Sequence, residues 1–192
     1  MQHRPLLLAS LAALTACGGV PLRSIPRLMS LSGALLDANP AEFLVALQVD
    51  ARIAPPATAV PLLSIQLTPK VVGAFEPVDK RLPLQLAAPS TAAAGLQPAP
   101  AGRRWLVYGL PPATQAELSR IQNMVRHAQA QPGYQRGGRL SLGIEQTELA
   151  LTNPQLANTR WATWLQVKKA EGYFEIWTGT PAQILALANA KR

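Results

Sequence analysis

The sequence has only one cysteine, Cys17, in 192 residues. A lone cysteine has no partner within its own chain, which excludes an internal disulfide and leaves packing alone to stabilise the fold. The sequence also has no long apolar run near its start. The run at residues 6–13 reaches Gly18 and Arg23 well before the roughly 20 apolar residues that a transmembrane helix needs. This run is therefore too short to cross a membrane as a helix.

The chain begins with the features of a secretory signal peptide. Residues 1–5 carry His3 and Arg4, and the apolar run and small residues follow. The stretch Leu14-Thr15-Ala16-Cys17 resembles the lipobox of bacterial lipoproteins, in which a branched apolar residue and small residues precede the cysteine that is lipidated before cleavage. The resemblance implies that residues 1–16 are a signal peptide and that Cys17 carries lipid. An ordinary secretory signal with an incidental cysteine is the alternative.

The resemblance also implies a location. In some bacteria an Asp directly after the lipidated cysteine favours retention in the inner membrane, whereas this chain has Gly18 there. That residue implies transfer to the outer membrane, with the protein on its periplasmic face. Several acyl chains on one cysteine anchor a protein stably, while a single chain binds a membrane only marginally. The triacylated cysteine of this family would hold the chain to the membrane without a spanning segment.

Length and charge set the class of the remaining chain. Removal of 16 of the 192 residues leaves 176, enough for one domain with its own core. The net charge of +8 becomes +7 because Arg4 leaves with the signal peptide. A basic surface suits anionic envelope components such as phospholipid head groups, and it also keeps a protein soluble. Nucleic acid would fit this charge but not the compartment.

Alternating apolar and polar residues predict strands along much of the chain. In residues 43–53 the odd-numbered positions are apolar, Leu47 among them, and Gln48, Asp50 and Arg52 face the other way. Pro83 places a weaker strand at a sheet edge. The predicted strands are 43–53, 63–67, 82–86, 105–110, 140–144, 161–167 and 173–178.

Two helices are expected from start signals. Residues 114–117 and 180–183 both have the Thr-x-x-Glu/Gln pattern of a capping box. An apolar stripe from Leu118 to Ala128 follows the first at helical spacing, and Pro181 favours the first helical position of the second. The second helix is expected to run to the cations at the end of the chain, which complement its dipole.

Two segments are expected to lack regular structure. Prolines mark residues 17–27 as a lipidated tether, and residues 87–102 are almost all Ala, Pro, Gly, Ser and Thr, the composition of a flexible surface loop. Residues 28–192 are therefore expected to form a single periplasmic α+β domain. We expect a mostly antiparallel sheet with two helices packed on it.

No catalytic or metal-binding pattern is recognisable. His127 is the one histidine outside the predicted signal peptide, and its angular position turns it away from the apolar stripe, so we expect it to be exposed and without a metal partner. Glu145 and Glu148, three apart in a predicted strand, would point to opposite faces. Residues 135–139 lack the helix and lysine of a phosphate-binding loop. We expect no enzymatic activity, cofactor or metal.

Aromatic residues concentrate near the C-terminus. A four-residue hairpin loop at residues 169–172 would place Val167 opposite Phe174 and Leu165 opposite Ile176 on an aliphatic face. The same register sets two cross-strand pairs on the other face, namely Trp164 with Trp177 and Lys168 with Tyr173. Two interpretations stay open: a second small core under a helix or loop, which we favour because large apolar patches are seldom bare, or a binding surface.

The sequence favours a non-catalytic binding or assembly module of the cell envelope, anchored in the outer membrane through Cys17. Besides the membrane, the expected partner is another envelope protein or an anionic envelope component. Two alternatives stay open, namely a hydrolase of an envelope substrate and an accessory lipoprotein of a secretion or transport complex.

Lipidation at Cys17 is directly testable. In cells grown with a labelled fatty acid, the wild-type chain is expected to incorporate the label and the Cys17→Ala variant to lose it, because the lipid bonds to that sulfur. Equal labelling of the two proteins would contradict the lipobox interpretation.

Overall fold

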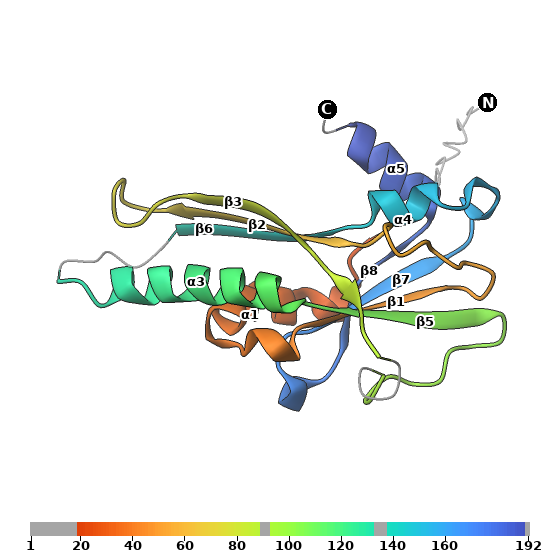
Figure 1. Ribbon diagram of the computed structural model, residues 1–192, viewed down its shortest axis with the longest axis horizontal. Coiled ribbons are helices and arrows are strands. Elements are labelled where there is room, and N and C mark those ends of the chain that lie inside the picture. Colours follow the sequence, from red (N-terminus) through yellow and green to blue (C-terminus); the bar gives the residue numbers. More distant parts are fainter. Residues whose placement is uncertain (1–18, 89–92, 133–137, 191–192) are drawn as a thin grey trace, which may run out of the picture.

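The computed structural model describes residues 19–88, 93–132 and 138–190. Helices and two antiparallel sheets make up an α+β fold, which confirms the predicted class (Figure 1). In chain order the elements are η1 (Leu22–Ser24), α1 (Ile25–Asp37), η2 (Pro40–Glu42), β1 (Leu44–Asp50), β2 (Leu62–Pro69), β3 (Val78–Pro83), β4 (Gln85–Leu86), β5 (Arg103–Gly109), α3 (Pro112–Gln129), β6 (Gly138–Glu145), α4 (Thr147–Leu151), η3 (Pro154–Leu156), β7 (Trp161–Gln166), η4 (Lys169–Glu171), β8 (Phe174–Gly179) and α5 (Pro181–Asn189).

Every predicted strand overlaps an observed one, although β1 ends at Asp50 and not at the predicted residue 53, and the strands form two sheets instead of one. One sheet has the order β4-β5-β1-β7-β8 and the other β3-β2-β6. The predicted strand at residues 82–86 is divided between them, because the chain passes from β3 to β4 at the buried residue Leu84. Pro83 ends β3, at the edge of its sheet, as expected for a residue with no N–H to donate.

β1 is the central strand of the five-stranded sheet, paired with β5 on one side and β7 on the other. The side chains of Val45, Leu47 and Val49 are buried in the main core, as the alternation predicted. Ala46, on the opposite face, is also fully buried and belongs to a second, smaller cluster. The main core continues along the molecule, where α3 runs beside the three-stranded sheet (Figure 1).

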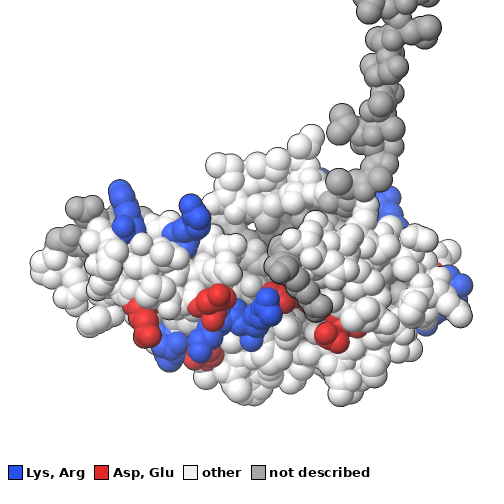
Figure 2. Space-filling model, turned by 90° about the horizontal axis from the view of Figure 1, so that it is seen from above, with Lys and Arg blue, Asp and Glu red and all other residues white. Residues whose placement is uncertain are grey.

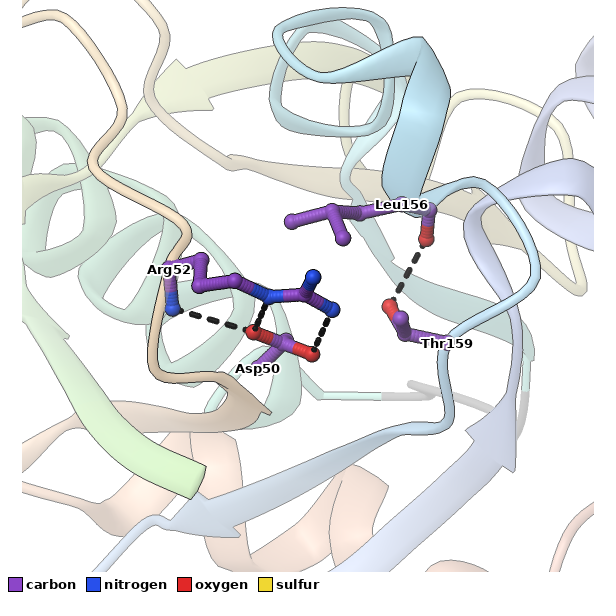
Figure 3. Close-up of polar contacts among 4 residues, drawn as sticks. All are labelled: Asp50, Arg52, Leu156 and Thr159. Carbon is purple, nitrogen blue, oxygen red and sulfur yellow. Dashed lines mark hydrogen bonds and ion pairs between the residues drawn. The ribbon is translucent and has the colours of Figure 1, made fainter. Parts of the chain in front are cut away.

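β1 ends in a turn closed by an ion pair (Figure 3). The carboxylate of Asp50 accepts hydrogen bonds from the backbone N of Arg52 at 3.0 Å and from its guanidinium Nε and Nη2, each at 2.8 Å. The Arg52 guanidinium holds the pKa of Asp50 well below its ordinary value. Beside this pair, the Thr159 hydroxyl donates to the Leu156 carbonyl at 2.7 Å, which closes a second turn. Both contacts shape loops at this end of the sheet.

The prediction of an irregular tether at residues 17–27 is wrong for its described part. Regular structure begins at Leu22, and Pro26 lies in the first turn of α1, where a missing N–H costs nothing. α1 buries Leu31 and Leu35 in the main core. At its C-terminal end, the buried amide of Gln122 on α3 donates to the Leu35 carbonyl at 2.7 Å, and to that of Ala38 at 2.9 Å. The two helices are thereby joined.

The two predicted helices are present as α3 and α5, and the structure adds α1 and α4. The capping box at Thr180 and Gln183 is confirmed, with both of its hydrogen bonds formed. The one at residues 114–117 is wrong, because Pro112 starts α3 earlier. The Thr114 hydroxyl instead donates to the Pro83 carbonyl at 3.1 Å, which ties α3 to β3.

Truncation of Leu47 tests the assignment of the β1 core face. Leu47 is 1% exposed, so Leu47→Ala is expected to lower the free energy of unfolding by about 2–5 kcal/mol. The neighbouring Gln48 is half-buried on the other face, and Gln48→Ala serves as the matched control with an expected change within about 0.5 kcal/mol. Urea unfolding measures both. A silent Leu47→Ala would show that the inward face is misassigned.

Candidate functional site

A groove of about 510 Å³ lies where β2 and β6 meet β7, β8 and α5. Its lining comes from segments far apart in the sequence that the two sheets bring together. The lining residues are Val60, Leu62, Arg81, Ile144, Glu145, Gln146, Thr147, Glu148, Thr163, Ile176, Trp177, Ile184, Leu187 and Ala188. The volume is within the range of pockets that hold small ligands or a few side chains of a partner.

A polar pair lies among the apolar groups of the groove. The amide Nε2 of Gln146 donates to the Thr163 hydroxyl at 2.9 Å, and both side chains are buried. The Gln146 Oε1 atom is also buried and has no hydrogen-bond partner among the described residues. A buried amide oxygen without a donor costs about 1–3 kcal/mol of desolvation, so this atom is suited to accept a hydrogen bond from a bound group.

The walls of the groove combine aliphatic side chains and one indole with charged and polar groups. Ile144 and Ile176 line it from the sheets, Trp177 from β8, and Ile184 from α5. Leu187 of α5 is 57% exposed and extends the apolar surface outwards. Residues 181–190 contain no charged side chain. This composition indicates that part of the surface of this helix is apolar.

Two carboxylates line the same groove, contrary to the expectation that they would face apart. The strand ends at Glu145 and α4 begins at Thr147, so Glu148 belongs to a helix and the strand alternation does not reach it. Glu145 forms an ion pair with Arg81, with Nε and Oε1 separated by 3.2 Å. Among the described residues, the groove has no histidine, lysine or cysteine and the fold has no metal-binding cluster.

The predicted register of the C-terminal hairpin is wrong. A bulge between Thr163 and Trp164 sets Thr163 opposite Trp177 and Trp164 opposite Glu175. The predicted four-residue loop is also too short: β7 ends at Gln166 and β8 begins at Phe174, so Leu165 pairs with Phe174 instead of Ile176. The alternation of side chains is broken at the bulge, so the proposed strip of Trp164, Tyr173 and Trp177 does not exist as one surface. Trp177 packs against the main core, whereas Trp164 and Tyr173 belong to the second cluster.

The second cluster lies under part of the segment predicted to be a flexible loop. Trp105 and Trp164 meet edge to face with ring centroids 6.0 Å apart. The Trp105 Nε1 donates to the Gln97 carbonyl at 2.9 Å, and Leu96 packs on the same cluster. Residues 89–92 of that loop lie outside the described residues. Burial raises the pKa of the Tyr173 phenol to about 12, in agreement with its place in this cluster.

Other residues singled out in the sequence lie away from the groove. His127 is exposed on α3, with its Nε2 3.2 Å from the Gln131 amide, as its angular position predicted. The Lys168 ammonium lies 3.9 Å from Glu171 in the hairpin loop. Cys17 and residues 135–137 lie outside the described residues. Figure 2 shows positive and negative side chains interspersed along one side of the molecule, without a broad basic area on that face.

A double-mutant cycle tests the separation of the tryptophans. Trp105→Ala and Trp164→Ala are expected to be non-additive by about 0.5–1.5 kcal/mol, because an edge-to-face pair is lost only once. Trp164→Ala and Trp177→Ala are expected to add within about 0.5 kcal/mol, since they belong to different clusters. Denaturant unfolding of the single and double variants measures both couplings. A large coupling between Trp164 and Trp177 would show that the two side chains share one surface, contrary to the observed register.

No family model, curated protein or solved structure matches this chain, so its function has to be argued from its own residues.

Proposed function

We propose that the chain is an envelope lipoprotein that acts as a non-catalytic binding or assembly module. In this proposal the groove between the two sheets and α5 holds an apolar segment of another envelope protein. The location is supported by the lipobox resemblance at residues 14–17. Among the described helices, none is both long and apolar enough to cross a bilayer. Attachment through lipid on Cys17 supplies the membrane contact in this proposal.

The unpaired oxygen of Gln146 is the observation that carries the binding proposal. A buried acceptor without a donor destabilises the free protein. A bound group that donates a hydrogen bond to it would remove that cost. The surrounding apolar walls would exclude water from that hydrogen bond and strengthen it. A partner is therefore expected to insert an apolar side chain beside Trp177 and to donate one N–H or O–H group to Gln146.

The apolar surface continues beyond the groove, which favours a protein partner over a small enclosed ligand. α4 and α5 pack against each other, and each exposes a leucine, Leu151 on the first and Leu187 on the second. Exposed apolar groups next to a pocket with both apolar and polar lining are typical of protein interfaces, which combine an apolar centre with a polar rim. An accessory lipoprotein of a transport or secretion complex would be a specific case of the same activity.

The shared position of Glu145 and Glu148 favours the second candidate, a hydrolase. Glycoside hydrolysis requires two carboxyl groups a few ångströms apart across a substrate cleft. The ion pair of Glu145 with Arg81 instead gives that carboxylate a structural partner. If the groove were catalytic, Glu148→Gln would abolish turnover of an envelope glycan by the purified chain and leave its melting temperature unchanged.

Site-specific photo-crosslinking tests the binding proposal. A photoreactive residue at position 187 of the full chain is expected to form a protein adduct in intact envelopes. The same residue at position 86 is the matched control, because Leu86 is 58% exposed on β4 and lies outside the groove. Gln146→Leu keeps the side-chain volume and removes both the Oε1 acceptor and the donor to Thr163, so the adduct from position 187 is expected to fall about tenfold.

Mapping the adduct and measuring stability decide the outcome. The crosslinked peptide is expected to contain apolar residues of one defined partner. A thermal melt of Gln146→Leu shows whether a loss of adduct comes from unfolding. Equal adducts from positions 187 and 86, or an adduct insensitive to Gln146→Leu in a folded protein, would contradict binding in the groove.

A further inference from the structure

Residues 19–27 are attached to β8, the edge strand of the five-stranded sheet. Gly19 and Thr178 exchange two backbone hydrogen bonds, of 2.9 and 3.2 Å. The Arg23 guanidinium is ion-paired with Glu175, whose carboxylate is buried and also accepts a hydrogen bond from the Thr178 hydroxyl. The Arg27 guanidinium carbon lies 5.4 Å from the centroid of the Phe174 ring. We call these contacts the β8 latch.

The latch leaves almost no free chain between the fold and the expected lipid. Only Gly18 separates Cys17 from Gly19, which is held on β8. Two residue steps span at most about 7 Å even when fully extended. A lipid on Cys17 would therefore keep the β8 edge at the surface of the bilayer, without a tether on which the domain could turn.

The segment that follows the latch exposes an apolar face. Leu22 is 83% and Met29 79% exposed, and Val20 and Ile25 are also exposed. Leu22 lies in the 3-10 turn three residues before Ile25, which places the two on the same side, and at about 100° per residue Met29 follows Ile25 at roughly 40° on α1. Leu31 and Leu35 point to the opposite side, into the core. Ile25 and Met29 thus place apolar side chains on the solvent side of a helix whose other side is buried, and such exposed groups are typical of a surface that contacts a partner or a membrane.

The charge of this segment is of one sign. Residues 19–36 contain Arg23 and Arg27 but no Asp or Glu. The Arg23 side chain is 70% exposed but its charge is balanced by Glu175, so Arg27 supplies the net positive charge of this segment. An apolar stripe flanked by arginines is the pattern of a segment that lies in the interface of a membrane with anionic lipids.

We propose that the exposed face of residues 20–29, formed by Val20, Leu22, Ile25 and Met29, inserts into the boundary between head groups and acyl chains of the membrane that carries the Cys17 lipid. This inference rests on the proposed lipidation. The lipid and the apolar face then make two attachments a few residues apart, and the β8 latch transmits them to the sheet. The domain is held in one orientation on the membrane.

The test places a photoreactive benzoylphenylalanine at position 29 of the full chain, produced in bacteria that supply a labelled fatty acid. Position 72 is the matched control, because Val72 is 98% exposed in the turn between β2 and β3, far along the chain from the latch. Irradiation is expected to give a phospholipid adduct from position 29 at least about tenfold above that from position 72. Leu22→Asp is expected to reduce the adduct from position 29 severalfold while fatty-acid labelling persists.

The two readouts separate the failure of each proposal. Labelled protein with equal or absent phospholipid adducts, or with protein adducts from position 29, would overturn membrane docking and leave lipidation standing. If the fatty-acid label is absent, the proposed anchor fails. The chain is then coupled through its Cys17 thiol to a maleimide phospholipid in vesicles of phosphatidylethanolamine and phosphatidylglycerol. Adducts from position 29 alone would still support the face, and their absence would overturn it.

Discussion

Burial of β1 along one face, and at Ala46 on the other, is the constraint on which the rest of the structure depends. Val45, Leu47 and Val49 belong to the main core, which also contains residues of the helices and of the three-stranded sheet, while Ala46 belongs to the tryptophan cluster. A strand with residues in both joins two cores that would otherwise be separate clusters. The chain has one cysteine and hence no internal disulfide. The two clusters are therefore held together by this shared strand and by its pairing with β5 and β7.

β8 connects the two proposed functional surfaces. Phe174, Glu175 and Thr178 hold the N-terminal segment, and Ile176 and Trp177 line the groove. Because the groove and the latch use the same six-residue strand, a chain held to a membrane by the latch would also hold the groove close to that membrane. The burial of Glu175 has a clear physical reason in this arrangement: its charge is paired with Arg23 and accepts a second hydrogen bond.

The strands and the helices α3 and α5 could be predicted from the sequence because period-two and period-3.6 patterns are local properties. α1 does not follow from the sequence pattern alone, because a proline breaks a helix in its interior but is favourable in the first turn, where Pro26 lies. The extent of α1 is readable in hindsight from the apolar residues between positions 28 and 36. The hairpin register has no local signal, because neither the longer connection between β7 and β8 nor the bulge changes the composition. The groove could not be predicted, because Gln146 and Thr163 meet only through tertiary packing.

The error in the tether changes what lipidation would mean for this protein. A flexible linker would let a lipoprotein reach partners at a range of heights and angles, with the linker entropy lost on each binding event. A latched segment removes that freedom before any partner arrives, so binding at the groove would cost less orientational entropy. The groove partner would then have to approach within the narrow zone next to the bilayer that β8 occupies. An integral membrane protein presents apolar segments at that height, which makes it the class of partner best matched to both surfaces.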